Sequence, residues 1–181
     1  MMFAAESRGS GTMTSKSAKH LEKRSTSQAE SSAYALEVVV TSFGYKLGPP
    51  PLANVVFDVR FLKNPFWVAE LKPLTGLDSP VQQYVLEQEL AQDFLETLKI
   101  LLGKVLPKMA ELRVGQFVIA FGCTGGQHRS ATLVEKLADE LAQTYPDYKI
   151  VKVHRELGIK SDDGDDEGED ESTASGAVPS P

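Results

Sequence analysis

The residues best suited to chemistry lie in one stretch, IAFGCTGGQHRS at positions 119–130. This stretch holds Cys123, the only cysteine in the chain, followed by two glycines, His128, Arg129 and Ser130. Glycines let the backbone approach a ligand closely, and arginine offers phosphate oxygens a planar, two-pronged donor. Because the stretch follows an apolar run and precedes a helical pattern, it predicts a strand, a glycine-rich turn and a helix N-terminus. That arrangement is typical of anion-binding sites.

A phosphate group is the natural ligand for such a turn. The predicted ligand-binding residues of the turn are Cys123, Thr124, Gly125, Gly126, Gln127, His128, Arg129 and Ser130. The competing interpretation is a tight strand-to-helix turn with a surface arginine. A nucleotide-binding Walker loop and a GxGxxG dinucleotide loop are both absent, which argues against the two commonest nucleotide sites.

Residues 123–130 also match C-x5-R-[ST], the signature of cysteine-dependent phosphatases. In those enzymes the loop amides and the arginine hold the phosphoryl group while a thiolate attacks it. A helix N-terminus and a nearby arginine favour the thiolate form that such attack requires. However, Gly122 stands where that class usually has a histidine, and a small half-buried cysteine at a strand end explains the residue equally well. The sequence leaves catalysis by Cys123 and Arg129 open, and we favour a non-catalytic binding module.

The elements around this stretch alternate between strands and helices. Apolar runs at 35–45, 54–62, 116–122 and 148–154 predict strands. One helix is expected from Ser79, as its cap, to about Leu106, and another after Arg129. The face of the long helix is predicted to carry Val81, Tyr84, Val85, Leu90, Phe94, Leu98, Leu101, Leu102 and Val105. This order predicts an α/β fold: a single domain with a largely parallel sheet flanked by helices and ligands at the carboxyl ends of the strands.

The two ends of the chain differ in composition from its centre. Residues 1–33 are rich in serine and lysine, and residues 161–181 carry eight acids and no base, so we predict disordered tails there. The folded domain is then residues 34–160. The net charge of −6 comes from the ends, and the centre has equal numbers of acids and bases. One cysteine excludes an intramolecular disulfide framework and a cysteine zinc cluster, and we expect no metal or cofactor.

The sequence also bears on location and partners. No apolar run reaches the ~18–20 residues that cross a bilayer, so no membrane contact is expected. A cytoplasmic protein fits best. A serine-rich, basic N-terminus leaves organelle targeting open, although Glu6, Glu22 and Glu30 argue against it. The oligomeric state is not fixed by any of these features.

Three segments carry a resemblance to a known family. They are VFDVRFLKNPFWVAELKPLTGLDSPVQQYVL at 56–86, GCTGGQHRS at 122–130 and VHREL at 153–157. In this order and spacing they resemble the C-terminal domain of the RNase adapter protein RapZ family, over about 36–157. The resemblance implies an α/β domain related to the sugar-phosphate-binding part of phosphofructokinases. It also implies sensing of glucosamine 6-phosphate and, in the bacterial protein, help in binding a small RNA for an RNase.

The resemblance also implies which residues form the pocket. Asp58 and Arg60 would lie at the end of the second strand with Asn64 nearby, and the loop 123–129 would surround the phosphate. A carboxylate there could accept hydrogen bonds from sugar hydroxyls or an ammonium group, which makes a two-pole site for an amino-sugar or hexose phosphate. Asp58 could instead be a structural partner of Arg60. The implied role is a sensor or regulatory module for a phosphorylated metabolite.

Some positions depart from the family pattern. Phe66 replaces a histidine associated with the sugar pocket, and Gln127 replaces a frequent lysine. The acidic end at 161–171 would repel RNA, and the family's N-terminal nucleotide-binding domain has no counterpart here, so adapter activity and nucleotide hydrolysis are not transferred. RNA or a protein partner remains an alternative. RNA contact would use Arg60, Lys63, Arg129, Lys152 and Arg155.

Overall fold

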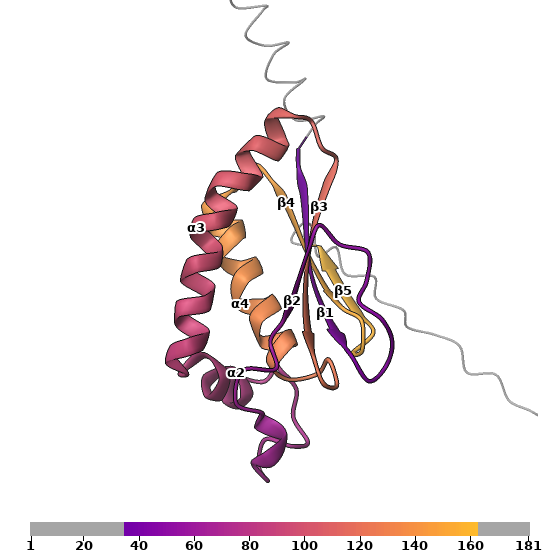
Figure 1. Ribbon diagram of the computed structural model, residues 1–181, viewed down its shortest axis with the longest axis vertical. Helices are drawn as coiled ribbons and strands as arrows, with labels where there is room; N and C mark the ends of the chain where they lie inside the picture. The colour runs from indigo at the N-terminus through magenta and orange to yellow at the C-terminus, as the bar shows by residue number, and fades with distance from the viewer. Residues whose placement is uncertain (1–34, 163–181) are drawn as a thin grey trace, which may run out of the picture.

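The computed structural model describes residues 35–162, which form an α/β domain (Figure 1). The elements in chain order are β1 (Glu37–Gly44), β2 (Val55–Asp58), the short 3-10 helix η1 (Pro65–Trp67), α2 (Ser79–Leu86), α3 (Glu89–Glu111), β3 (Gln116–Cys123), α4 (Arg129–Thr144), β4 (Lys149–His154) and β5 (Ile159–Asp162). The predicted fold class is confirmed. The segments predicted to be disordered tails lie outside the described residues, apart from the few that border the domain.

The sheet has the strand order β2-β3-β1-β4-β5. The first four strands are parallel, with Val38 of β1 opposite Phe117 of β3 on one side and Ile150 of β4 on the other. β5 is antiparallel to β4 and was not predicted. It includes Ser161 and Asp162, so the ordered ladder extends two residues into the segment assigned to the acidic tail.

The helices cover one face of the sheet (Figure 1). The connections β2 to β3 and β3 to β4 move in the same direction across the sheet. Right-handed crossovers in one direction place their helices on the same face. Here α4 packs on β1, β3 and β4. Alternate strand residues such as Val38, Val40, Ile119 and Phe121 face the helices and form the core with buried leucines of α3 and α4.

The single helix predicted from Ser79 to about Leu106 is in fact two helices, α2 and α3. The chain is extended at Gln88, whose side chain accepts from the amide of Lys63 and donates to the carbonyl of Tyr84. After this break the buried face changes. Leu98 and Leu102 are buried as predicted, but Leu90 and Leu101 are exposed, and the other buried positions of α3 are Ala91, Leu95 and Leu106.

The start of α2 also differs from the prediction. Asp78, not Ser79, is the capping residue, and its carboxylate accepts from the amide and hydroxyl of Thr75. Gln82 donates to the carbonyl of Gly76 rather than completing a capping box with Ser79. Within residues 35–162, no helix combines the length and apolar character needed to span a membrane.

Candidate ligand-binding site

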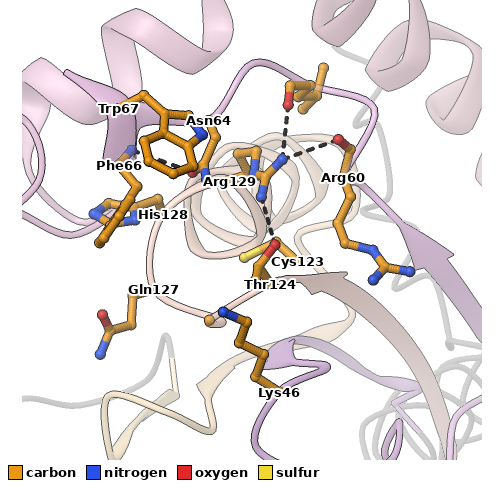
Figure 2. A pocket seen from close by; sticks show the side chains of 12 residues that line it. Lys46, Arg60, Asn64, Phe66, Trp67, Cys123, Thr124, Gln127, His128 and Arg129 are labelled. Atoms are coloured by element: carbon orange, nitrogen blue, oxygen red, sulfur yellow. Dashed lines mark hydrogen bonds between the residues drawn. The ribbon is translucent and has the colours of Figure 1, made fainter.

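A cavity of about 620 Å³ lies where β1, β2 and β3 end, at the carboxyl edge of the parallel sheet (Figure 2). This is the position at which α/β sheets generally bind ligands. Its volume is within the range of small-molecule sites. The lining residues are Lys46, Arg60, Leu62, Asn64, Phe66, Trp67, Cys123, Thr124, Gly125, Gln127, His128 and Arg129.

The glycine-rich loop between β3 and α4 forms the base of this cavity. A Cβ added at Gly125 would meet nothing within 4 Å, so the loop backbone is open to the cavity at this position. Gly126 has φ +75°, and a Cβ there would approach the backbone nitrogen of Gly44 to 2.8 Å. Only glycine adopts that conformation readily and fits that space. Gly126 therefore sets the conformation of the loop by packing against β1, and it is not part of the pocket lining.

The thiol of Cys123 is held by the loop that follows it. Its Sγ accepts a hydrogen bond from the amide of Gly126 at 3.2 Å and lies 3.1 Å from the hydroxyl of Ser130. The cysteine is buried but contributes to the pocket surface. Ser130 is fully buried at the start of α4 and acts on the pocket only through Cys123. Two hydrogen-bonding groups on one sulfur tie the end of β3 to the helix.

Arg129 is buried, with 4 % of its surface exposed, and its guanidinium is largely occupied by the protein. Nη1 donates to the carbonyls of Arg60 and Leu62, at 3.1 and 2.9 Å, and Nη2 donates to the hydroxyl of Thr124 (Figure 2). Three of its five N–H groups thus hold the chain after β2 and the loop after β3, which leaves one N–H of Nη2 beside Nε. Its Nε has no hydrogen-bond partner.

His128, directly before α4, is the second buried side chain with an unmet polar atom. It is 8 % exposed, lines the cavity, and its Nε2 has no hydrogen-bond partner. Buried polar atoms in proteins are nearly always paired, so each exception calls for an explanation. The amides of Gly125, Gln127 and His128 also lack an acceptor within the described residues. These groups surround the positive end of the α4 dipole.

Asp58 and Arg60 lie together after β2, but only Arg60 lines the cavity. The Arg60 guanidinium donates from Nε to both Asp58 oxygens and from Nη2 to Oδ2 at 2.6 Å, and it lies 4.4 Å from the ring centre of Tyr45. The hydrogen bonds from Arg60 hold the pKa of the Asp58 carboxyl below its ordinary value. Asp58 thus takes the alternative role of structural partner to Arg60.

The segment 64–67 forms the opposite wall. Asn64 caps η1 by accepting from the amide of Phe66 at 3.3 Å, so its backbone and that of η1 are fixed relative to each other. Phe66 and Trp67 are in edge-to-face contact with ring centres 5.4 Å apart. Both line the cavity and remain exposed, 41 % for Phe66 and 81 % for Trp67. His128 lines the same cavity (Figure 2).

Four lining residues, Lys46, Leu62, Phe66 and Trp67, were not among the residues predicted to bind the ligand, and the charged one is Lys46. It follows β1, and its amide donates to the carbonyl of Thr124, which ties the two strand ends together. Its side chain extends toward Cys123 and Thr124 (Figure 2). Lys46 supplies a positive charge close to the loop. The uncharged Gln127, which replaces a frequent lysine of the family, does not supply one. Lys46 lies two positions past β1, a central parallel strand. Once the strand order is known, that position indicates a residue at the ligand edge of the sheet.

Of the eleven residues predicted to bind the ligand, the structure brings eight into one cavity lining. These are Arg60, Asn64, Cys123, Thr124, Gly125, Gln127, His128 and Arg129. The other three, Asp58, Gly126 and Ser130, lie directly beside it and contact lining residues or their neighbours. Among the described residues, no group of three or more His, Cys, Asp or Glu side chains could hold a metal ion.

The residues considered for RNA contact are mostly engaged within the protein. Arg129 is buried, Lys152 pairs with Glu135 and Asp139, and Arg155 pairs with Glu156. Arg155 also donates to the carbonyls of residues 44 and 49. These basic side chains stabilise the fold around β4 and the loop, and nothing in their contacts marks an RNA-binding surface.

Comparison with known proteins agrees with this geometry. Residues 36–158 match the family model described as the RapZ C-terminal domain. A nucleotide-binding protein of Bacillus cytotoxicus is 49 % identical over 123 residues, covering 68 % of this chain and 41 % of that protein. A nucleotide-binding protein of Staphylococcus carnosus is 47 % identical over 124 residues, covering 68 % and 40 %. The chain therefore spans about two fifths of the length of these relatives.

Proposed function

Because the chain belongs to the RapZ C-terminal domain family, we propose that the pocket at the carboxyl edge of its sheet binds a phosphorylated small metabolite, an amino-sugar or hexose phosphate. In this proposal the domain is a sensor or regulatory module that responds to the metabolite, in the cytoplasm.

The observation that carries the proposal is the pair of unmet buried nitrogens, His128 Nε2 and Arg129 Nε, at the N-terminus of α4. They lie beside loop amides without acceptors and close to Lys46. An anion in this place would accept hydrogen bonds from the free amides. It would also offset the free-energy cost of burying the two nitrogens without partners. The dipole of α4 and the charge of Lys46 both favour a negative group at this place. Phosphate, with several acceptor oxygens, suits such a convergence of donors.

The test is a thermal-shift screen of the full chain with inorganic phosphate, hexose phosphates, an amino-sugar phosphate and nucleotides. A ligand at a hundred times its dissociation constant stabilises a protein by ~2.7 kcal/mol, which is easily detected. Lys46→Gln should weaken the binding of the best ligand about fivefold or more, because a charge-assisted contact is lost.

The matched control is Lys104→Gln, which makes the same change in charge at an exposed residue of α3, outside the pocket lining and toward the opposite edge of the sheet. It should leave the affinity within about twofold of the unmodified chain, as expected for a distant exposed charge screened by salt. Equal losses in the two variants would mean that general charge, not this pocket, attracts the anion. A screen in which no phosphate compound shifts the melting temperature would contradict the proposal itself.

A second candidate function is favoured by the contacts of Cys123. The Gly126 amide donates to its Sγ and the Ser130 hydroxyl lies 3.1 Å from it, so the sulfur is held at the start of α4, where a nucleophile would have to lie. A cysteine phosphatase would hydrolyse a phosphate ester, and Cys123→Ser would abolish turnover while phosphate still bound. The test is to assay the unmodified chain and the Cys123→Ser variant for hydrolysis of an aryl phosphate ester. Turnover that survives the substitution, or none in the unmodified chain, leaves the binding module as the function.

A further inference from the structure

The connection between β1 and β2, residues 45–54, lies on the face of the sheet that the helices leave open (Figure 1). In the order β2-β3-β1-β4-β5 this connection crosses β3 in the direction opposite to the β2–β3 and β3–β4 connections. A right-handed crossover in the opposite direction runs over the opposite face. Residues 45–54 contain no helix or strand, so an extended chain takes the place that a helix has on the other face.

Three consecutive prolines, Pro49, Pro50 and Pro51, lie in this crossover and are followed by Leu52. Proline fixes its own φ at about −65°, and it keeps the residue before it out of the helical region. Pro49 and Pro50 are therefore restricted to the polyproline II conformation, which forms no hydrogen bonds within itself. We call residues 49–52 the proline segment.

The proline segment is tied to the sheet on both sides. On one side Arg155 donates from Nη1 to the carbonyl of Pro49 at 2.8 Å and from Nη2 to the carbonyl of Gly44. On the other side the amide of Asn54 donates to the carbonyl of Val118 at 3.0 Å, and the Asn54 Oδ1 accepts from the amide of Val118 at 2.7 Å. A segment that is already held in an extended form loses little conformational freedom when a partner binds it.

Between these ties the proline segment faces solvent. Leu52 is fully exposed, at 100 %, and Pro49 and Pro50 are exposed as well. The carbonyls of residues 50–53 accept no hydrogen bond from the part of the chain that the structure describes. Aromatic-lined grooves recognise this combination, because proline rings pack on aromatic faces and tryptophan or tyrosine side chains donate to the carbonyls.

The surface around the proline segment suits an uncharged partner. No charged residue lies between Lys46 and Asp58 along the chain. The segment thus has no basic side chain of its own for a nucleic-acid backbone. A cavity of about 300 Å³ adjoins it, lined by Leu52, Ala53, Asn54, Gln116 and Val118. This cavity shares no lining residue with the pocket at the carboxyl edge of the sheet.

We propose that the proline segment is a docking motif for a protein domain whose groove is lined by aromatic side chains and binds polyproline II ligands. The prolines pack on the rings of that groove, Leu52 fills the adjoining pocket, and the free carbonyls accept from a tryptophan or tyrosine of the domain. The inference does not depend on the proposed function, because no residue of the proline segment lines the metabolite pocket.

The test uses purified WW, SH3 and EVH1 domains as probes, since these classes bind polyproline II ligands in aromatic-lined grooves. Calorimetric titration with the full chain should show saturable binding by at least one of them. The double variant Pro50→Ala, Pro51→Ala should weaken that binding about tenfold, because the segment loses two rings and is free to leave the polyproline II conformation. Leu52→Ala should weaken it roughly threefold or more.

Two matched controls make the same changes elsewhere. Pro73→Ala replaces an exposed proline that has no proline neighbour, and Leu112→Ala truncates an exposed leucine after α3. Both should leave the affinity within about twofold, as is usual for surface substitutions. Leu52→Ala also guards against loss of the fold, because a fully exposed side chain is not part of the core.

Three outcomes would overturn the inference. The first is that none of the three domains binds the full chain. The second is binding that neither Leu52→Ala nor the double proline variant weakens, since the domain would then contact another surface. The third is a dimer of the chain in sedimentation experiments that Leu52→Ala dissociates, because the occupant would then be a second copy. Phosphate binding should be the same in all these variants, which keeps this test separate from that of the proposed function.

Discussion

At the scale of single residues, Arg129 ties together the segments that line the pocket. Its position after a glycine-rich loop suggests a direct phosphate contact. In the structure its Nη1 donates to the carbonyls of Arg60 and Leu62, so it fixes the chain that leads to Asn64 and Phe66. Nη2 donates to the hydroxyl of Thr124, so the arginine joins the loop after β3 to the segment 64–67. Nε and the second N–H of Nη2 have no partner among these contacts.

Another residue-scale arrangement lies behind the pocket, at His154. Its Nδ1 is 3.0 Å from the hydroxyl of Ser42 and its Nε2 is 2.8 Å from Glu135 Oε1. Ser42 and His154 are buried, so this serine–histidine–glutamate chain is closed to substrates and is structural. The hydrogen bond from His154 to the Glu135 carboxylate, together with the nearby Lys152, holds the pKa of Glu135 below its ordinary value.

This pKa gives a prediction of pH dependence. A carboxyl whose pKa is depressed by folding contributes stability above its unfolded pKa, near 4.5, and loses it as pH falls through the folded value. Glu135→Gln should therefore lower the free energy of unfolding by about 1–2 kcal/mol at neutral pH. The difference between the variant and the unmodified chain should shrink below about pH 4.5. Urea denaturation across this pH range measures it, and a difference independent of pH would contradict the account.

At the scale of elements, the loop before α2 is fitted against the start of α4. The amide of Gly76 donates to the carbonyl of Gln127 at 2.7 Å, and a Cβ at Gly76 would lie 2.4 Å from His128 O and 2.5 Å from Thr132 N. These are backbone atoms, which cannot move without displacing the helix N-terminus. The position of the N-terminus of α4, and of the cavity that it borders, therefore depends on Gly76, about fifty residues away in sequence.

Gly76→Ala should consequently lower the free energy of unfolding by about 1–3 kcal/mol, the usual cost of overpacking, and weaken phosphate binding as well. Gly115→Ala is the matched control, since a Cβ there would meet nothing within 4 Å. Its effect should stay within about 0.5 kcal/mol. Chemical denaturation of both variants makes the comparison. If Gly76→Ala and Gly115→Ala were equally stable, the 73–78 loop would be able to move away from α4 at no cost, which would contradict the prediction.

At the scale of the whole molecule, the α/β class and the parallel strands could be predicted because apolar runs alternate with helical patterns. The cluster of Cys123 to Arg129 was predictable for the same reason, since a strand, glycines and a helix follow each other without interruption. Asp58 was predicted at the end of the second strand and lies there, but its bonding to Arg60 was only one of two alternatives, and Lys46 was not found. Their roles depend on which strands are neighbours, and local sequence does not encode that order.

The helix break at Gln88 and strand β5 were missed for related physical reasons. Leu90 and Leu101 were assigned to one continuous helix, whereas the chain is extended at Gln88, whose side chain bonds to the amide of Lys63. β5 is a short edge strand whose pairing partner, β4, supplies its ladder. Tertiary contacts override local propensity in both cases.

The central place of β1 in the sheet has a consequence for synthesis on the ribosome. This strand is among the first described segments to emerge, yet its two neighbours begin only at Gln116 and Lys149. Until both have emerged, the nascent chain carries an apolar ribbon, Val38 to Val40, with two open hydrogen-bonding edges, a form that invites aggregation. The carboxyl edge of the sheet, where the cavity lies, is thus complete only after β4 has been made, and a stalled chain shorter than about 154 residues would need protection by a chaperone.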